Sequence, residues 1–231
     1  MTRTAGSPSS ERERPTRETE HELRRDGHRT IVGIDEVGKG AWAGPLAVGV
    51  AIVPSESSSP HDVEAMIRDS KSISEKKRER IFDDLASWVG DWSVGMASPM
   101  ECDELGMSRA QRLATERALS GLRTPPDAAI VDGSWDFVTP LVPHVTTMVK
   151  GDTRSLSVAA ASILAKVTRD RLMRELADQH PAYRFESNKG YPCAWHRAGL
   201  FALGPSAIHR RSWAFMDGLG FWGGIRRPRE S

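Results

Sequence analysis

Two runs of strand-forming residues on either side of a glycine-rich turn constrain this chain most strongly. The runs cover residues 30–35 and 46–53, and the turn between them contains Gly38, Gly40 and Gly44. Short runs rich in Val, Ile and other apolar residues favour β-strands, while glycine permits tight turns. The ordered part of the chain is therefore predicted to begin with a hairpin-like pair of strands.

Helical and strand-like patterns alternate after this pair. Ser72 and Glu75 have the spacing of a capping box ahead of a periodic apolar segment, which is typical of a helix start. The predicted elements are a helix over about 74–88, a strand over 91–97, a helix over 105–122, strands over 128–132 and 142–149, and a long Ala-rich helix over 155–179. Such interleaving predicts the α/β fold class.

The two ends of the chain differ from this middle part. Residues 1–28 contain almost no apolar side chains and are predicted to form a disordered tail. A basic arm that binds nucleic acid is the alternative, but six acidic residues balance its six arginines. One domain is expected over residues 29–222, with short helices from about residue 181, followed by a basic tail over 223–231.

Charge is distributed unevenly along the chain. The net charge is only +1, but residues 1–28, 29–150 and 151–231 carry 0, −5 and +6 respectively. An acidic stretch followed by a basic one suits a metal-dependent enzyme that acts on a phosphate backbone, because carboxylates bind cations and Lys and Arg bind phosphates. Chance variation in surface charge is the competing explanation.

Composition also limits the compartment. Hydrophobic residues make up 39% and charged residues 27%, which with a mean hydropathy of −0.44 excludes a membrane-embedded protein. Cys102 and Cys193 are too few for a disulfide framework or a zinc site, and no secretory signal is recognisable. A cytoplasmic protein with no membrane partner is expected.

Four acidic residues stand where predicted strands end or loops begin. Asp35 and Glu36 close the first strand, Asp132 closes the strand over 128–132, and Asp152 precedes the long helix. Carboxylates without accompanying His or Cys favour Mg²⁺ or Mn²⁺ over zinc. The residues alone indicate a divalent-metal hydrolase, and they leave open ordinary strand-end and N-cap roles for each carboxylate.

A series of sequence motifs indicates which protein family this chain resembles. Residues 33–40 read Gly-Ile-Asp-Glu-Val-Gly-Lys-Gly and are followed by Ala-Gly-Pro at 43–45. Further blocks occur at 69–71, 131–133, 150–152, 159–170, 188–192 and 209–212. In this order they resemble the type 2 ribonucleases H, bacterial ribonuclease HII in particular.

The resemblance implies a fold, an activity and a catalytic site. The fold is a ribonuclease H-like mixed β-sheet flanked by helices, with a small helical C-terminal extension. The implied activity is cleavage of RNA in RNA–DNA hybrids and on the 5′ side of single ribonucleotides in duplex DNA. Asp35, Glu36, Asp132 and Asp152 match the family's catalytic carboxylates, which are expected to hold two divalent ions, Mn²⁺ or Mg²⁺.

The resemblance also implies contacts with the substrate. Gly38, Lys39 and Gly40 stand where the family has a Gly-Arg-Gly turn whose backbone senses the 2′-hydroxyl. The lysine should preserve these main-chain contacts, but any bidentate phosphate contact of the arginine becomes a single-point one, which puts the affinity in doubt. Tyr191 matches a tyrosine that stacks on the sugar at the RNA-to-DNA junction. The candidate phosphate contacts are Lys71, Lys166, Arg169, Lys189, Arg210 and Arg211.

Two alternatives to this interpretation remain at the level of sequence. A non-catalytic module that binds hybrids would keep the fold, but it would not need four carboxylates near phosphates. A ribonuclease HIII would carry an additional N-terminal domain, and only about thirty polar residues precede the first strand here. A monomeric enzyme whose partners are hybrid duplexes and ribonucleotide-containing DNA is therefore expected.

Overall fold

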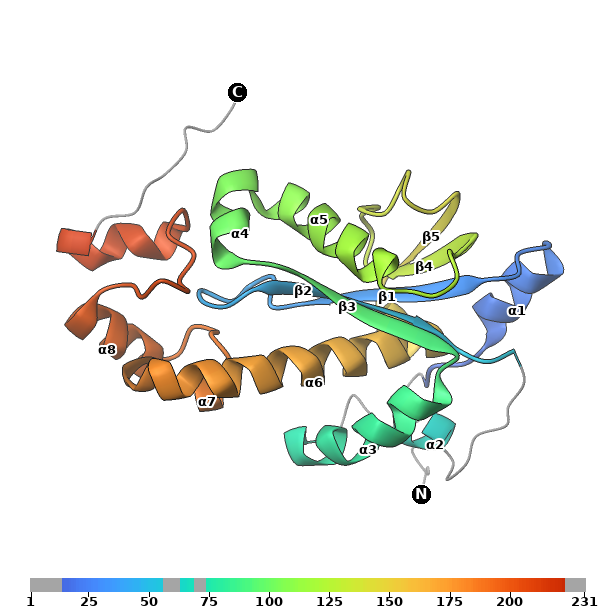
Figure 1. The fold of residues 1–231 in the computed structure, drawn as a ribbon, viewed down its shortest axis with the longest axis horizontal. Coiled ribbons are helices and arrows are strands. Elements are labelled where there is room, and N and C mark those ends of the chain that lie inside the picture. Colours follow the sequence, from blue (N-terminus) through green and yellow to red (C-terminus); the bar gives the residue numbers. More distant parts are fainter. Residues whose placement is uncertain (1–13, 56–62, 69–73, 223–231) are drawn as a thin grey trace, which may run out of the picture.

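A five-stranded mixed sheet forms the centre of the molecule (Figure 1). The computed structural model describes residues 14–55, 63–68 and 74–222. The strands are β1 (Ile31–Val37), β2 (Leu46–Ile52), β3 (Asp91–Ala97), β4 (Ala128–Asp132) and β5 (His144–Met148), in the spatial order β3-β2-β1-β4-β5. β1, β2 and β3 pair antiparallel, whereas β1, β4 and β5 pair parallel. The ribonuclease H-like mixed sheet expected from the sequence is thus confirmed.

Helices cover both faces of this sheet. They are α1 (Glu18–Arg25), α2 (Val63–Arg68), α3 (Glu75–Trp88), α4 (Pro99–Leu105), α5 (Met107–Ser120), α6 (Leu156–Gln179), α7 (Phe185–Asn188) and α8 (Ala194–Leu203). α6 packs on one face with α2 and α3 outside it, and α5 packs on the other face (Figure 1). Among the described helices, none is long and apolar enough to cross a membrane.

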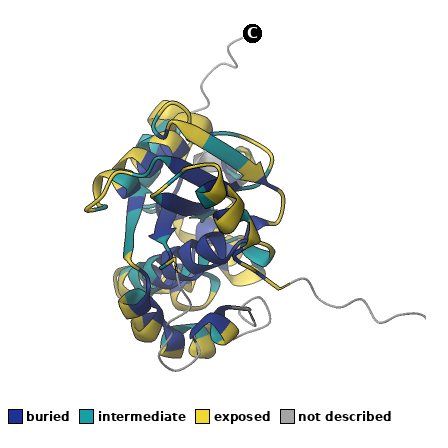
Figure 2. Ribbon diagram, turned by 90° about the vertical axis from the view of Figure 1, so that its right-hand side faces the viewer, coloured by how far each residue is buried: buried dark blue, intermediate teal, exposed yellow. Residues whose placement is uncertain are grey.

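The long helix α6 lies unusually close to the strands beneath it. A Cβ atom added to Gly33 of β1 would lie 2.1 Å from the Ser157 carbonyl carbon, and one added to Gly49 of β2 would lie 2.5 Å from the Ala161 oxygen. Glycines in the strands and alanines in the helix therefore let the two backbones approach. Figure 2 shows the resulting buried layer between sheet and helix. This contact fixes the N-terminal end of α6 against β1.

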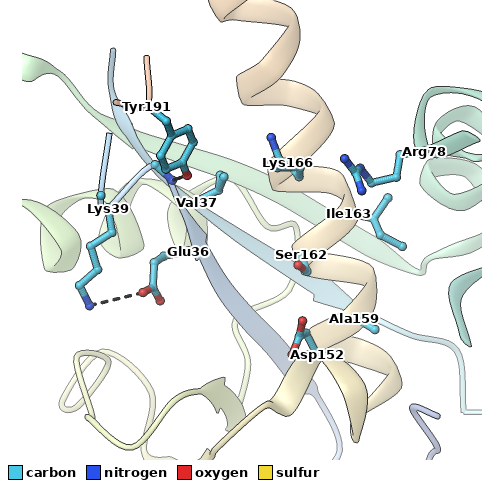
Figure 3. A pocket seen from close by; sticks show the side chains of 12 residues that line it. Glu36, Val37, Lys39, Arg78, Asp152, Ala159, Ser162, Ile163, Lys166 and Tyr191 are labelled. Carbon is cyan, nitrogen blue, oxygen red and sulfur yellow. Dashed lines mark hydrogen bonds and ion pairs between the residues drawn. The ribbon is translucent and has the colours of Figure 1, made fainter. Parts of the chain in front are cut away.

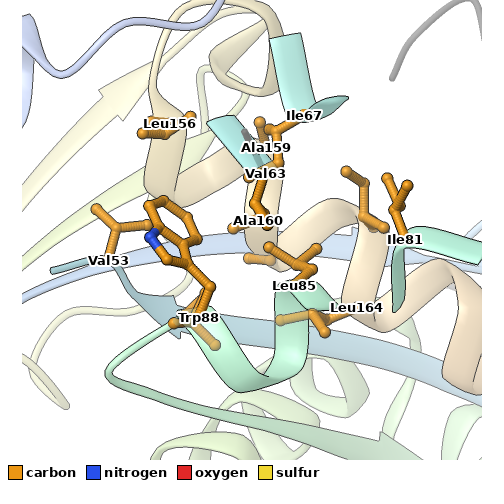
Figure 4. Packing of buried hydrophobic residues seen from close by; sticks show 14 of the residues in the cluster. Val53, Val63, Ile67, Ile81, Leu85, Trp88, Leu156, Ala159, Ala160 and Leu164 are labelled. Atoms are coloured by element: carbon orange, nitrogen blue, oxygen red, sulfur yellow. The ribbon is translucent and has the colours of Figure 1, made fainter. Parts of the chain in front are cut away.

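A hydrophobic cluster holds α6 from its other side. Leu85 and Trp88 of α3 and Ile67 of α2 pack against Leu156 and Leu164 of α6 (Figure 4). Burying one such side chain contributes roughly 1.5–3 kcal/mol. α6 is therefore held between the sheet and a second helical layer, and it provides a rigid base for the residues that precede it.

Most elements predicted from the sequence are present with shifted ends. The helix expected over 105–122 is α5 (Met107–Ser120). A further helix, α4 (Pro99–Leu105), precedes it and was not expected; Gly106, with a positive φ of 75°, separates the two. The structure shows a capping box at Ser98 and Glu101, at the start of α4. The predicted box at Ser72 and Glu75 involves a residue outside the described ranges.

The prediction of a disordered tail over residues 1–28 is wrong for its second half. α1 occupies Glu18–Arg25, and Leu23 packs against Ile31 and Val158. Arg17 forms a buried ion pair with Glu64 of α2. Composition did not reveal this helix because buried polar contacts, with a single leucine, attach it to the domain. Residues 1–13 and the predicted tail over 223–231 lie outside the described ranges.

Candidate active site

Parallel pairing brings the first three predicted carboxylates to one edge of the sheet. Asp35 and Glu36 lie near the C-terminal end of β1, and Asp132 ends β4. The paired residues Ile34 and Val131 directly precede Asp35 and Asp132, so these two aspartates are level on neighbouring strands. Side chains at the same level of adjacent strands point to the same face. Both therefore face α6, the helix that Gly33 approaches two residues earlier.

Asp152 reaches the same region from a short connecting turn. It lies in the 3₁₀ helix Gly151–Thr153, directly before α6. The amide of Gly151 donates a 2.6 Å hydrogen bond to Oδ1 of Asp132, which attaches this turn to the end of β4. The structure thus brings all four predicted carboxylates to the end of the sheet from three separate elements.

Asp35 is the most perturbed of these groups. Its side chain is only 9% exposed, and burial raises the pKa of its carboxyl to about 7, with the negative charges of Asp132, Glu36 and Asp152 acting in the same direction. A hydrogen bond from Ser162 of α6 partly opposes this rise. Four carboxylates that repel one another are stabilised by a bound cation.

The carboxylates do not converge on one point in this structure. Among the described residues, no three His, Cys, Asp or Glu side chains are arranged so that they could together hold a metal ion. Glu36 Oε1 instead lies 3.3 Å from Lys39 Nζ, as Figure 3 shows, and Asp35 Oδ1 accepts a 2.7 Å hydrogen bond from the Glu36 amide. With the Gly151 amide on Asp132, local partners therefore engage Asp35, Glu36 and Asp132.

The chemistry of the donor set nevertheless fits a hard divalent cation. All four side chains offer oxygen ligands, and burial of Asp35 beside three further negative charges leaves a need for positive charge. Asp35, Glu36, Asp132 and Asp152 are the residues that would hold Mg²⁺ or Mn²⁺ here. Their roles as ligands remain predictions.

A cavity of about 380 Å³ opens beside Glu36 and Asp152. Its polar and glycine lining comes from β1, the turn after it, α3, the 3₁₀ helix before α6, α6 itself and the segment after α7 (Figure 3). These residues are Glu36, Gly38, Lys39, Gly40, Arg78, Asp152, Ser162, Lys166 and Tyr191. Seven of them were candidate site residues from the sequence, so the structure places the predicted turn, tyrosine and two carboxylates around one space.

Tyr191 is fixed against the glycine-rich turn. Its hydroxyl accepts a 3.0 Å hydrogen bond from the Gly38 amide, and the guanidinium of Arg169 lies 5.5 Å from its ring centre. Gly38 has a φ of +85°, and a Cβ there would lie 2.2 Å from Arg169 Nε, so only glycine suits this position. Tyr191 is half-buried at the cavity wall.

Two predicted phosphate contacts are wrong in this structure, because Arg169 and Arg210 are completely buried. Arg169 donates to the carbonyl oxygens of Pro45 and Lys189, both at 2.9 Å. Arg210 donates to the Lys39 oxygen at 3.0 Å and to the Gly44 oxygen at 3.1 Å. Both guanidinium groups hold the backbone of the turn and leave no surface for a phosphate. A motif match could not distinguish these roles.

The other basic candidates occupy different environments. Lys189 is 4% exposed and its ammonium lies 3.1 Å from Glu75 of α3, so it forms an internal ion pair. Lys166 lines the cavity and pairs with Asp170. Arg211 is exposed, whereas Lys71 lies outside the described residues.

Sequence reasoning missed two cavity residues or left them undecided. Arg78 of α3 lines the cavity because α3 packs against α6, but it belongs to a basic run at 76–78 with no motif to single it out. Ser162 lies within a recognised motif, and its bond to Asp35 depends on tertiary structure. Neither contact could be derived from spacing alone.

A buried pair of histidines supports Tyr191 from behind. The Ser206 amide donates to Nδ1 of His209 at 2.9 Å, so Nε2 of His209 carries the proton and donates to Nε2 of His196, also at 2.9 Å. Nδ1 of His196 then donates to the Tyr191 carbonyl oxygen at 3.0 Å. This chain of hydrogen bonds requires both imidazoles to be neutral.

Acidification is expected to destabilise the fold through His209. Burial, together with the smaller effect of the neighbouring His196, lowers the pKa of His209 to about 3, whereas the unfolded value is near 6.5. The stability contribution is present above pH 6.5 and declines as the pH falls toward 3, because the unfolded state binds the proton more readily. In urea unfolding, the free energy of unfolding of the wild type should fall by about 2 kcal/mol more than that of His209→Gln between pH 7 and pH 5.

The control for this measurement is His21→Gln, since His21 is exposed on α1. This variant should follow the pH dependence of the wild type. Equal slopes for the wild type and His209→Gln would contradict the assignment of a neutral, buried His209.

Comparison with known proteins shows the family to which the chain belongs. Residues 32–216 match the family model described as Ribonuclease HII. A ribonuclease HII from Streptomyces avermitilis is 43% identical over 223 residues, which cover 94% of this chain and 91% of that protein.

Solved structures are similar as well. The ribonuclease H2 from Pyrococcus horikoshii superposes with a TM-score of 0.69 at 27% identity, covering 83% of this chain and 97% of the other. A ribonuclease HII from Archaeoglobus fulgidus, solved as a complex with PCNA, has a TM-score of 0.67 at 25% identity and covers 80% of this chain and 95% of its own. The resemblance noted in the sequence therefore extends over most of the domain.

Proposed function

Because this chain belongs to the ribonuclease HII family, we propose that it nicks duplex DNA on the 5′ side of a single embedded ribonucleotide. This activity would accompany the metal-dependent hydrolysis of RNA in RNA–DNA hybrids that the family membership gives. The products would be 3′-hydroxyl and 5′-phosphate ends. One observation carries the proposal: Tyr191 is hydrogen-bonded to the Gly38 turn in the cavity that Glu36 and Asp152 also line. Tyr191, the residue proposed to recognise the RNA-to-DNA junction, would thereby lie next to Glu36 and Asp152, which are proposed to take part in cleavage.

The turn supplies contacts that distinguish RNA from DNA. Sensing RNA requires recognition of the 2′-hydroxyl, and a main-chain contact needs a close approach. A Cβ at Gly40 would meet nothing within 4 Å, so this side of the turn is open to a ligand. Arg210 holds the Lys39 carbonyl from the opposite side. The turn is therefore presented to the sugar in a fixed orientation.

The carboxylates supply the charge for hydrolysis. Asp35, Glu36, Asp132 and Asp152 would bind two divalent ions, Mn²⁺ or Mg²⁺, which activate a water molecule and stabilise the leaving 3′ oxygen. Ser162 orients Asp35 by its hydrogen bond, and the Gly151 amide orients Asp132. Glu36, which is paired with Lys39 here, would serve as a ligand to the cation, and Lys39 would then be free to face a phosphate of the substrate.

The remaining aspects of the proposal concern the state of the enzyme. We propose a monomer that acts in the cytoplasm on hybrids and on ribonucleotide-containing DNA. Of the phosphate contacts expected from the sequence, Lys166 and Arg211 remain candidates among the described residues, and Lys39 would join them on leaving Glu36. The family assignment favours catalysis over a role as a non-catalytic binding module.

The test is cleavage of a labelled DNA duplex that contains one ribonucleotide. Products resolved to one nucleotide should show a single cut 5′ of the ribonucleotide with Mn²⁺ or Mg²⁺, and none after EDTA. A uniform RNA–DNA hybrid serves as the positive control and an all-DNA duplex as the negative control. Cleavage of the hybrid without incision at the single ribonucleotide would overturn the proposal.

A further inference from the structure

Glu20 of α1 is a buried carboxylate that bonds to the start of α6, the helix that follows Asp152. Glu20 is 0% exposed, and its Oε1 accepts hydrogen bonds from Ser155 Oγ at 2.7 Å, the Ser157 amide at 2.9 Å and Ser157 Oγ at 2.7 Å. α1 lies outside residues 32–216, which the family model matches. All three bonds go to Oε1, and the buried Oε2 has no hydrogen-bond partner among the described residues, so burying this carboxylate is costly. Through these contacts Glu20 is fixed to Ser155 and Ser157 at the start of α6.

The backbone beside Glu20 strengthens the same attachment. The Thr16 amide donates to the Arg154 oxygen, and the Leu156 amide donates to the Thr16 oxygen, both at 2.9 Å. Ser155 Oγ also caps α6 by accepting from the Val158 amide at 3.3 Å. A negative charge at a helix N-terminus is favourable, because the first amides of the helix are positively polarised. The N-terminal segment thus clamps the first turn of α6.

Hydrogen bonds continue from this clamp into the candidate site. The Ser155 amide donates to the Gly151 oxygen at 2.8 Å, and the Gly151 amide donates to Asp132 Oδ1 at 2.6 Å. Asp152 lies within the turn between these two bonds. Glu20 is therefore connected to Asp132 and Asp152 through one short, continuous stretch of backbone.

We propose that Glu20 is a positioning residue, which holds the Gly151–Thr153 turn in the orientation in which Asp132 and Asp152 bind a divalent cation. The inference rests on the metal site of the proposed function. Glu20 touches neither substrate nor cation, and it acts through Ser155 and Ser157. Loss of the clamp lets the turn move relative to β4 and separates the carboxylates.

The experiment compares Glu20→Ala and Glu20→Gln with the wild type in the full chain. Mn²⁺ affinity is measured by titration calorimetry without substrate, kcat and KM on a uniform hybrid, and Tm by thermal unfolding. Glu20→Ala should weaken Mn²⁺ binding and lower kcat by about 10-fold each. KM should stay unchanged, because the glycine turn and Tyr191 are not attached through this clamp.

Two further variants make the result specific. Glu20→Gln retains an oxygen acceptor for the serines and should recover most of the Mn²⁺ affinity. Glu22→Gln alters an exposed residue of the same helix and should match the wild type. If Glu20→Ala does not fold, Ser157→Ala, which removes one of the three donors, tests the same clamp more mildly.

The outcomes separate this inference from the proposed function. Glu20→Ala protein with a lower Tm but wild-type Mn²⁺ affinity and kcat would overturn the positioning role and leave α1 purely structural. Wild-type protein that neither binds Mn²⁺ nor cleaves the hybrid would overturn the metal site, and the inference with it.

Discussion

Asp35→Asn is expected to abolish cleavage of RNA–DNA hybrids and, at the same time, to stabilise the metal-free protein at neutral and alkaline pH. The amide preserves the shape of the side chain but removes the negative charge needed to bind a cation. Burial raises the pKa of Asp35 to about 7, and the charges of Asp132, Glu36 and Asp152 contribute to the rise. The unfolded value is near 3.8. The wild type therefore loses stability as the pH rises from about 4 through 7, since the folded state binds the proton more tightly.

The measurement is urea unfolding in EDTA at pH 4 and pH 8, together with hybrid cleavage in Mn²⁺. Relative to the wild type, the free energy of unfolding of Asp35→Asn should be higher by about 4 kcal/mol at pH 8 and little changed at pH 4. Asp83→Asn, at an exposed position of α3, is the matched control and should change neither property. Wild-type turnover by Asp35→Asn would remove this residue from the proposed metal site, and equal stability at pH 8 would contradict its raised pKa.

This opposition between stability and activity explains why the site needs support from several elements. Ser162, the Gly151 amide and Glu20 each oppose the repulsion or fix the backbone that carries the carboxylates. Functional sites commonly retain strain of this kind because charge that is unfavourable in the free protein is required for the reaction.

Local patterns were sufficient to predict most of the sheet and the long helix. The strand pair β1 and β2, the strand β4 and the helix α6 all follow from apolar periodicity and turn residues. α1 could not be predicted in this way. Its attachment depends on Arg17 with Glu64 and on Glu20 with two serines, and such pairs are far apart in sequence. A hydropathy pattern indicates where apolar side chains are buried, but it does not indicate where charged side chains are buried in ion pairs or hydrogen bonds.

The site itself was predicted in part. Asp35 and Asp132 are 97 positions apart in the sequence, and only the parallel pairing of β1 with β4 makes them neighbours. A family resemblance supplied this pairing indirectly, whereas spacing could not. The same resemblance failed for Arg169 and Arg210, because motif positions do not indicate whether a guanidinium binds phosphate or backbone oxygen. Charge in the basic third of the chain is therefore partly internal.

Tyr191→Ala should impair incision at a single ribonucleotide at least 10-fold more than cleavage of a long hybrid. The ring is predicted to stack on the sugar at the RNA-to-DNA junction; for comparison, a base stacked on an aromatic side chain contributes about 1–3 kcal/mol. A single ribonucleotide offers one junction and one register, whereas a long hybrid can be cut in many registers. The measurement is kcat/KM on both substrates, and its readout is the ratio of the two values.

Tyr191→Phe divides this effect into its two physical parts. The variant keeps the ring and loses the hydroxyl that accepts from the Gly38 amide. Because the turn becomes less rigid, kcat/KM on both substrates should fall by an amount equivalent to about 1 kcal/mol of transition-state stabilisation. Tyr183→Phe is the matched control, because its hydroxyl donates to the Gly204 oxygen inside the C-terminal core. That variant should lower Tm and leave the substrate ratio unchanged. An equal loss on both substrates in Tyr191→Ala would show that the ring positions the turn and does not read the junction.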